Sequence, residues 1–542
     1  MLKLVGATGV AATVAGCVSE EAEDDPGNGN GNGNGNGNGN GAPDDEREFV
    51  APATQVYGTI DPAKQTDYTE AMATNNFYEP LITVDGETRE PTDSMAVEWD
   101  VEDDGVTWVF EIREGVPFHD GGEMTAEDVV YTLDRMMAID QGYSSLWREV
   151  IDVGAAEARD ENTVAIELDF EYGPFVATLV QLFIVDSETV SENEADGDWG
   201  EEYLSDNVAG TGAYLLESWS SGEEMVYTQF EDYWQGWDDD QVARVRTPVI
   251  SEEGTITQMM QQGDAHMTSM FLSTDNYEEM AAMDGVWVPE EPQWQLFHLP
   301  MNVQKEPLDD VHVRRAMVYA FNYQSAVDDI FRGGNVAAGP VPVGMPGHNG
   351  DIDPHEQDLD AAMDEIEASS YTVEEINEIG LEHYYIADDD VQRQIHLLFN
   401  QGLDEIGIEL EGSAQTWATV TDVAANPETT PHFTNIFRTA TVPTPDGHTY
   451  MMFHPDEQGS FVAMNWNEDD ELAAILEEAR STADEEDRLQ LYQESQARIV
   501  DQAYNISIAN PPYRIGISED IDGWNYRGIL SFDFNWYDLY WQ

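Results

Sequence analysis

Two stretches of the chain place apolar side chains at every second position, which is the pattern of a strand with one solvent-facing side. The first runs from Val106 to Ile112 and follows Asp103-Asp104-Gly105, a sequence typical of a hairpin turn. The second runs over 164–170. We therefore predict a strand over each stretch.

Other stretches repeat their apolar positions at intervals of three and four residues, as one face of an amphipathic helix does. These stretches are 313–321, 472–479 and 489–499. Thr482 supplies a capping signal for the last helix, and Thr125 with Asp128 resembles a capping box that opens a fourth helix. Strands and helices alternate without a fixed repeat, so we expect a mixed α/β protein and neither a solenoid nor a bundle.

The first residues resemble an export signal. An apolar run from Leu4 to Gly16 is too short to span a bilayer but suits the apolar core of a secretory signal. It ends in Val14-Ala15-Gly16-Cys17, which resembles the lipobox of secreted lipoproteins, in which the cysteine is lipidated and becomes the mature N-terminus. We expect a signal peptide over 1–17 and lipidation of Cys17. Lys3 stands alone before the apolar run, like the end of a twin-arginine signal that begins upstream of Met1.

A tether follows this signal. Residues 18–48 carry an acidic patch and then a strict alternation of glycine and asparagine from Gly27 to Gly41. Such a segment has nothing apolar to bury, so we expect it to be flexible. Attached to a lipidated cysteine, it lets a folded body move above the outer face of the cytoplasmic membrane. No later stretch is long and apolar enough for a transmembrane helix.

The large negative net charge limits which classes of molecule the protein can bind. The 542 residues include 110 Asp and Glu against 21 Lys and Arg, a formal net charge of -89. This charge makes nucleic acid, itself a polyanion, an improbable partner. Because salt screens the self-repulsion of so many acids, we interpret the surface as adapted to a high-salt medium. The length favours two or three domains, and the single cysteine excludes an intrachain disulfide framework.

The sequence lacks the motifs of several common kinds of enzyme. None of the three lysines follows a glycine, which excludes a P-loop ATPase, and neither H-E-x-x-H nor G-x-S-x-G occurs. The segment 348–356 gathers two histidines and three acids without the spacing of a known metal site, so we expect no metal and no cofactor. A pair of carboxylates could indicate a glycoside hydrolase, but among 110 acids many pairs lie at a suitable separation by accident, so such pairs neither favour nor exclude that activity. The scarce arginines and the aromatic residues are therefore the informative ones.

Longer motifs follow one another in a fixed order. They are Phe77-Tyr78-Glu79-Pro80-Leu81, the run from Trp108 to Gly121, Thr125 to Val129, Gly210 to Tyr214 with Tyr233-Trp234, and Asn302 to Ala320. In this order they resemble the signature of ABC-transporter solute-binding proteins of family 5, the dipeptide, oligopeptide and nickel type. The segment 470–541 is similar to the C-terminal part of that family, so the resemblance spans the body from Phe49 to Gln542.

The resemblance implies an α/β, two-lobed, periplasmic-binding-protein-like fold of type II, with an extra domain inserted in the first lobe. The expected limits are 49–66 with 207–298 and 506–542 for lobe one, 67–206 for the inserted domain and 299–505 for lobe two. Phe118-His119-Asp120-Gly121 then falls in the inserted domain, away from the cleft, and we interpret it as structural.

The resemblance also implies a function without catalysis. Two lobes close on a peptide or similar solute and deliver it to permease subunits, which are powered by separate ATPase subunits. We expect such a protein to be a monomer and not an enzyme. An oligosaccharide or other hydroxylated solute is the alternative within the family. From other classes, a secreted hydrolase with a carboxylate pair and a surface adhesin stay open.

Peptide-binding relatives hold the ligand's ammonium group with an aspartate a few residues after a Gly-Trp pair in lobe two. Here Phe437 stands where the tryptophan would be, and Ala440 stands near the place of the aspartate. Because the aspartate of the relatives is missing here, we expect another residue to hold the solute. Asp446 could substitute from a neighbouring position, or Arg438 could offer a cation to an acidic or hydroxylated solute, with a surface ion pair as its alternative role.

The resemblance places further candidates near the cleft. They are Tyr57 and Thr59, the stretch from Trp294 to Phe297, and Trp417 as a candidate of the same kind. Each of these aromatic residues has core packing as its alternative role.

Overall fold

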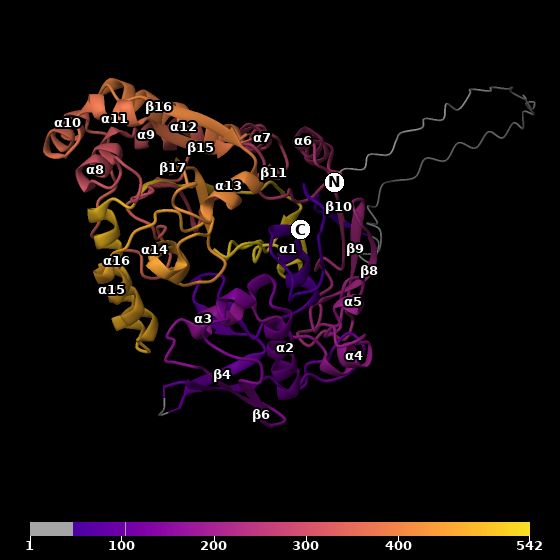
Figure 1. Cartoon of the computed structure of the whole chain (residues 1–542). Helices are drawn as coiled ribbons and strands as arrows, with labels where there is room; N and C mark the ends of the chain where they lie inside the picture. The colour runs from indigo at the N-terminus through magenta and orange to yellow at the C-terminus, as the bar shows by residue number, and fades with distance from the viewer. Residues whose placement is uncertain (1–46, 103–104, 388) are drawn as a thin grey trace, which may run out of the picture. The chain divides into compact units, whose positions relative to one another are not determined.

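The computed structural model describes residues 47–102, 105–387 and 389–542 (Figure 1). The predicted signal peptide, Cys17 and the tether up to residue 46 lie outside the described residues, as do the two aspartates of the predicted hairpin turn. Within the described residues, no helix is long and apolar enough to cross a membrane.

Two four-stranded sheets come from the first half of the chain. One has the order β1 (Phe49–Val50), β10 (Arg244–Pro248), β9 (Glu224–Gln229) and β8 (Tyr214–Ser220). In it β1 runs parallel to β10, and the other pairs are antiparallel. The second sheet is antiparallel throughout, in the order β4 (Ala96–Val101), β5 (Thr107–Ile112), β7 (Thr163–Glu167) and β6 (Ala156–Asp160). Helix α2 (Ala126–Ile139) packs against β6 and β7.

Two further sheets come from the second half. The first has the order β14 (Asn335–Val336), β19 (Asn505–Asn510), β13 (Gln295–Pro300) and β18 (Ile436–Thr439), and it is antiparallel. The second is parallel, in the order β16 (Leu410–Gln415), β15 (Leu381–Ile386) and β17 (Phe433–Thr434). Helix α12 (Asp390–Glu405) packs against β15 and β16, next to which it lies in Figure 1.

The two halves are joined by a ribbon of antiparallel chain. Strand β11 (Val286–Trp287) pairs with β21 (Ile517–Ser518), β12 (Glu290–Pro292) pairs with β20 (Pro512–Arg514), and β13 pairs with β19. One crossing of the chain therefore runs alongside the other over 286–300 and 505–518. We call this pair of segments the hinge ribbon.

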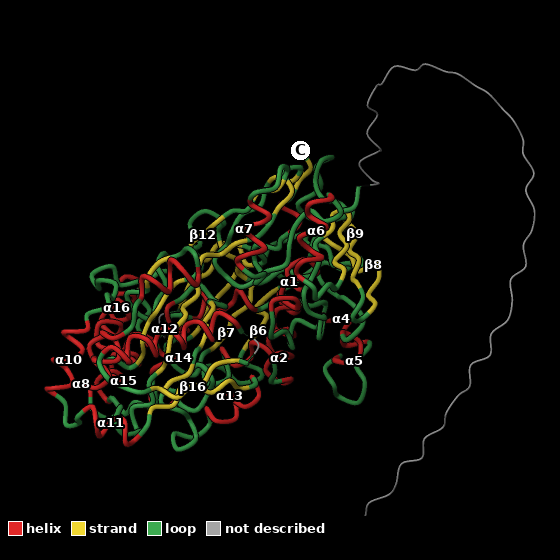
Figure 2. The backbone as a smooth tube through the Cα atoms, turned by 90° about the horizontal axis from the view of Figure 1, so that it is seen from above, coloured by secondary structure: helices red, strands yellow, loops and turns green. Residues whose placement is uncertain are grey.

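The remaining elements are mostly helical, and Figure 2 shows how they are interspersed with the strands. The helices are α1 (Tyr68–Phe77), α3 (Phe175–Thr178), α4 (Ser187–Glu192), α5 (Glu201–Leu204), α6 (Glu253–Gln262), α7 (Thr274–Ala281), α8 (Val311–Ala320), α9 (Tyr323–Ser325), α10 (Leu359–Ala368), α11 (Val373–Ile379), α13 (Trp417–Ala424), α14 (Tyr450–Phe453), α15 (Asp470–Ser481) and α16 (Glu485–Gln502). Two short pairs, β2 (Ile82–Val84) with β3 (Pro91–Asp93) and β22 (Ile521–Asp522) with β23 (Tyr540–Trp541), complete the strands.

The apolar interior is divided into separate cores. The first and largest contains buried side chains between Phe49 and Met270 and between Tyr513 and Leu539, together with Val442. The second contains buried side chains between Phe297 and Phe433 and between Ala503 and Ala509. Because each large core draws on its own segments, each side of the hinge ribbon has its own source of stability.

Most predicted elements are confirmed, with differences at their ends. Helix α2 begins after Thr125 in a capping box with Asp128, as predicted, because the Asp128 carboxylate accepts from the backbone N–H of Thr125 at 2.8 Å. The capping signal assigned to Thr482 is wrong. Thr482 ends α15, where its hydroxyl donates to the Glu478 carbonyl, and Asp484 caps α16 by accepting from the Asp487 N–H. The second predicted strand stops at Glu167.

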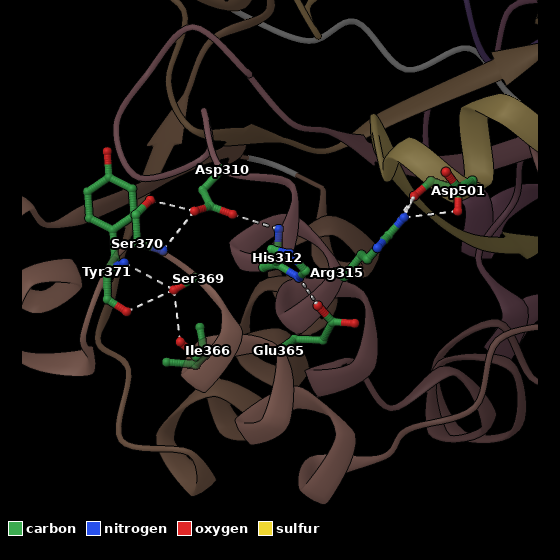
Figure 3. A network of polar contacts seen from close by, with 9 residues as sticks. All are labelled: Asp310, His312, Arg315, Glu365, Ile366, Ser369, Ser370, Tyr371 and Asp501. Atoms are coloured by element: carbon green, nitrogen blue, oxygen red, sulfur yellow. Dashed lines mark hydrogen bonds and ion pairs between the residues drawn. The ribbon is translucent and has the colours of Figure 1, made fainter.

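A polar network fixes the start of α8 against its neighbours (Figure 3). The Asp310 carboxylate accepts from the His312 N–H at 2.8 Å and from the Ser370 N–H at 2.8 Å. His312 Nδ1 lies 2.6 Å from a Glu365 oxygen on α10, and Arg315 donates to the Asp501 carbonyl on α16. Burial opposes the charge of Asp310, but the hydrogen bonds from Ser370 and His312 outweigh it and lower its pKa.

We predict that Asp310→Ala lowers stability by about 1–2 kcal/mol, because the helix loses its cap and Ser370 loses its acceptor. Since the pKa of Asp310 is lowered in the folded state, this contribution is present at neutral pH and is lost as the pH falls through that lowered pKa. Thermal melting of the variant and wild type at a fixed high salt concentration measures the difference.

The matched control is Glu367→Ala, which removes one exposed acid from α10. It should leave the melting temperature nearly unchanged, because an exposed acid in so acidic a chain loses little on removal. Equal melting temperatures for Asp310→Ala and Glu367→Ala would contradict the capping role.

Candidate functional site

A cavity of about 580 Å³ lies between segments from the two sides of the hinge ribbon. One wall comes from Gln65, Thr66, the stretch 142–150, Tyr172 and Thr178, with Leu530. The other comes from the stretch 437–462 and Arg480. We call it the cleft cavity. Its volume falls in the range of roughly 300–1,000 Å³ that small-molecule sites occupy.

Strand β18 forms part of the second wall because it is the edge of its sheet. It pairs with β13, so that Phe437 lies opposite Phe297 and Arg438 lies opposite Leu296. The ring centroids of Phe437 and Phe297 are 4.4 Å apart in an edge-to-face contact, which fixes Phe437 on the second core. Phe437 lines the cleft cavity and also a smaller cavity of about 130 Å³ beside Phe271.

Arg438 is half-buried in the same wall. Its Nε donates to the Gly447 carbonyl at 2.9 Å. Burial lowers the pKa of Arg438, and the nearby Tyr143 and Asp446 oppose this shift. The guanidinium therefore lies in a poorly solvated place at the cavity surface, where an anion would stabilise its charge.

Asp446 is already engaged. It forms an ion pair with Arg480 at 3.2 Å and accepts a hydrogen bond from the Tyr492 hydroxyl at 2.8 Å. Arg480 also lies over the rings of Tyr450 and Tyr172, at 3.7 Å and 5.0 Å from their centroids. Burial alone would lower the pKa of Arg480, but Asp446 and Tyr172 outweigh it and raise that pKa. Asp446 and Arg480 thus form a closed unit in the wall.

The structure brings Phe437, Arg438 and Asp446 together in the cleft cavity, and it places the other predicted residues elsewhere. Trp417, about half exposed on α13, packs edge-on against Phe461, which does line the cavity, with ring centroids 5.1 Å apart.

The remaining predicted residues lie in packed or turn positions. Tyr57 is buried and donates to Thr247 at 2.9 Å, and Thr59 accepts from the Asp61 N–H at 3.0 Å. Trp294 and Phe297 are fully buried. Their assignment to ligand binding stays a prediction.

Several cavity residues were not predicted from the sequence. Tyr143, Tyr172 and the acids Glu149 and Glu457 line the cavity, as does Arg480. The scarcity of cations in this chain is a signal that could have pointed to Arg480. The two glutamates carry no such signal. Burial and the proximity of Glu149 raise the pKa of Glu457, so the two acids repel each other across the cavity.

The metal-like cluster of the sequence contributes no site in the described residues, where no group of three or more His, Cys, Asp and Glu is placed to hold a metal ion. His348 Nδ1 instead lies 2.8 Å from the Val341 carbonyl, and His355 contacts the ring of Tyr323. Phe118-His119-Asp120-Gly121 lies away from the cleft cavity, and His119 Nε2 donates to the Gly212 carbonyl at 2.8 Å.

A second cavity, of about 380 Å³, contains a buried carboxyl group. Glu79 accepts from the Tyr233 hydroxyl at 2.8 Å and from Trp234 Nε1 at 2.9 Å. Burial raises the pKa of Glu79 to about 7, although these hydrogen bonds and Arg113 oppose the shift. The polar groups around Glu79 satisfy one another, so we interpret this cavity as structural.

Two separate cores, a hinge ribbon and a cavity between them are the architecture of a two-lobed solute-binding protein. The comparison with known families agrees. The model of the bacterial extracellular solute-binding proteins, family 5 middle region, matches residues 90–460. This chain therefore belongs to family 5 of the extracellular solute-binding proteins.

Curated relatives cover most of the chain. The probable D,D-dipeptide-binding periplasmic protein of Escherichia coli is 25% identical over 489 residues, which make up 88% of this chain and 91% of that protein. The dipeptide-binding protein of Escherichia coli is 24% identical over 482 residues, which make up 82% of this chain and 86% of that protein.

Solved structures share the fold. A periplasmic binding protein of Helicobacter pylori in complex with a peptide superposes with a TM-score of 0.75 at 21% identity and covers 91% of this chain and 98% of its own. An ABC transporter substrate-binding protein of Listeria monocytogenes superposes with a TM-score of 0.81 at 18% identity. The match covers 91% of this chain and 99% of that protein. The two-lobed α/β fold with an inserted domain is thereby confirmed.

We predict that Glu79→Gln changes how stability depends on pH. Because the folded state holds the Glu79 proton up to a pKa of about 7, wild-type stability falls as the pH rises from the ordinary carboxyl range to about 7, by on the order of 3 kcal/mol. The glutamine variant lacks this loss, so its melting temperature relative to wild type should rise from pH 5 to pH 8. An exposed control, Glu87→Gln, should run parallel to wild type. Parallel curves for Glu79→Gln would refute the buried carboxyl assignment.

Proposed function

We propose that this protein is an extracytoplasmic solute-binding lipoprotein of an ABC importer, which closes two lobes on a peptide and delivers it to the permease. The observation that carries the proposal is the cleft cavity, whose walls come from residues on both sides of the hinge ribbon. A solute that touches both walls favours the closed form by its differential affinity for that form.

Three hydrogen bonds join the two walls of the cleft cavity, and we propose that they hold the closed form. The Gly173 N–H donates to the Arg480 carbonyl at 2.7 Å, and Gln181 Nε2 donates to the Thr441 carbonyl at 2.6 Å. The Leu530 N–H donates to the Ala440 carbonyl at 3.2 Å. All three donate to backbone carbonyl groups near the cavity, so none of these three contacts is an ion pair that salt would screen.

Two relatives support the peptide class: the dipeptide-binding protein and the probable D,D-dipeptide-binding protein of Escherichia coli. The mixed lining fits a short peptide, because apolar residues such as Leu146 and Val462 alternate with charged and hydroxyl groups. A hydroxylated solute is the second candidate. The aromatic pair of Trp417 and Phe461 beside the cavity favours it, since such faces stack on sugar rings.

We place the lobes at the limits given by the sequence: lobe one at 49–66, 207–298 and 506–542, the inserted domain at 67–206, and lobe two at 299–505. The chain is anchored through Cys17, exported by the twin-arginine route and tethered by residues 18–48. We propose that it acts as a monomer without catalysis. The permease and its ATPase subunits are its protein partners.

The test combines two measurements on protein purified at high salt. Native mass spectrometry reads any co-purified solute, and small-angle X-ray scattering follows the radius of gyration with a panel of dipeptides and tripeptides. We expect at least one peptide to contract the protein and to be recovered unchanged. Turnover of an added peptide would favour a hydrolase, and contraction by oligosaccharides alone would favour the second candidate.

We predict that Gly173→Ala weakens peptide binding without touching the cavity. A Cβ at Gly173 would lie 2.2 Å from the Thr482 carbonyl oxygen, a backbone atom that cannot give way, so the two walls could not meet. The dissociation constant of the best peptide should rise roughly tenfold or more by calorimetry, and the contraction should shrink. Gly254→Ala on α6 is the matched control, because its Cβ meets nothing within 4 Å. Unchanged affinity in Gly173→Ala would contradict closure through this contact.

A further inference from the structure

We infer that Arg438 is the anchor for a carboxylate group of the solute in the cleft cavity. The inference rests on the proposed solute-binding function and names the chemistry that the cavity selects. It assigns the site to a solute with one carboxylate beside an apolar or aromatic group, held where Arg438 and Phe437 face the cavity.

The ion pairs of this chain make Arg438 exceptional. With 110 acids against 21 basic residues, an arginine on the surface meets a carboxylate easily. Most arginines of the described residues do form such a pair, from the exposed Arg393 with Asp390 to the buried Arg135 with Asp61. Within the described part of the chain, Arg438 forms none.

Arg314 and Arg488 also lack a carboxylate partner among the described residues, and each has a structural explanation. Arg314 is buried and donates to the carbonyl groups of Gln502 and Leu308, which satisfy its guanidinium. Arg488 donates to the Thr482 and Ala483 carbonyls and does not line the cleft cavity. Arg438 differs because it has one hydrogen bond and faces a cavity.

The hydrogen bond to Gly447 fixes the orientation of Arg438. It uses Nε, which leaves both Nη groups without a hydrogen-bond partner among the described residues. A guanidinium presents its donors in a planar fork that matches the two oxygens of a carboxylate. Because a buried cation without an anion is costly, a solute carboxylate gains more from this site than from water.

Asp446 favours the charge of Arg438, but no titratable group beside Arg438 forms an ion pair with it among the described residues. His298 and His448 are buried, and burial together with the charge of Arg438 lowers the pKa of each to about 3, so both are neutral. Asp446 is an acid of the same wall, but it forms no ion pair with Arg438, and its Oδ1 is engaged by both Arg480 and Tyr492. The Tyr143 hydroxyl adds a neutral donor to the same cavity.

The other acids of the cavity restrict the class further. Glu149 and Glu457 line it and repel each other. A solute with several negative charges would meet this repulsion. A solute with a single carboxylate and a neutral or cationic remainder would not. A free dipeptide has a single terminal carboxylate and a cationic amino terminus, so it fits this class of solute. Its carboxylate would then bind Arg438 on β18.

The experiment compares three probes for each dipeptide of the panel that contracts the wild type: the free peptide, its C-terminal amide and its N-acetyl form. Calorimetry is done at one fixed salt concentration, since salt screens the interaction. We expect the amide to bind wild type roughly 10- to 100-fold more weakly than the free peptide. The N-acetyl form keeps the carboxylate, so its affinity for wild type should fall less, relative to the free peptide, than the affinity of the amide does.

Variants then assign the effect to the residue. In Arg438→Met the free peptide and its amide should bind equally weakly, and in Arg438→Lys part of the preference should return. The matched control is Arg148→Met, which removes another cavity arginine, one whose partner is Asp140. It should keep the preference for the free acid. Melting temperatures of all variants verify folding.

The outcomes separate the two claims. An amide that binds wild type as tightly as the free peptide overturns the carboxylate anchor and leaves peptide binding intact. A preference for the free acid that survives in Arg438→Met overturns the assignment to Arg438. If Arg438→Met weakens both probes by the same factor, the residue is structural and the inference fails. Binding of no peptide by wild type defeats the proposed function, and with it this inference.

Discussion

The hinge ribbon is the constraint on which the geometry of the site depends. Its strands are hydrogen-bonded to each other along 286–300 and 505–518, so the two sides of the molecule cannot twist independently about a single connection. One strand of the ribbon, β13, is also the partner of β18, which carries Phe437 and Arg438. The wall of the cavity is thus built directly on the connection between the lobes, and any bending of the ribbon changes the distance between the walls.

The sequence predicts the fold well because local signals and motif order agree. The capping box at Thr125 and the alternation that ends at Ile112 are short-range effects that the structure reproduces. The error at Thr482 has a simple cause. Thr482, Asp484 and the residues after them offer several capping side chains in a row, and only the actual backbone path decides which one accepts the N–H. Composition cannot make that choice.

The site was less predictable for a physical reason. Aromatic residues such as Tyr57 and Trp294 are suited to a cleft and to a core alike, and their burial is decided by neighbours far away in sequence, including Thr247 and Tyr526. In a chain with so many acids, the position of one acidic residue does not indicate a binding site. For this reason the sequence did not identify Glu149 and Glu457 as residues of the cleft cavity. Arginines do carry one, because each cation is rare. The segment that corresponds to the family's aspartate pointed to Arg438, and the scarcity of arginines made that residue informative before the structure located it beside the cavity.

The contact between Gly173 and Arg480 has a kinetic consequence. The backbone carbonyl of Arg480 receives the Gly173 N–H from the opposite wall, while its side chain is held by Asp446 and the ring of Tyr450. Breaking the wall contact leaves the pair of Asp446 and Arg480 in place, but opening also separates the Arg480 guanidinium from the ring of Tyr172 on the opposite wall. If the chain closes on its solute as proposed, the residence time of that solute depends on how often the few hydrogen bonds between the walls open. Under that proposal, a second protein surface that took over the wall carbonyl groups of Arg480, Thr441 and Ala440 would speed the release of the solute.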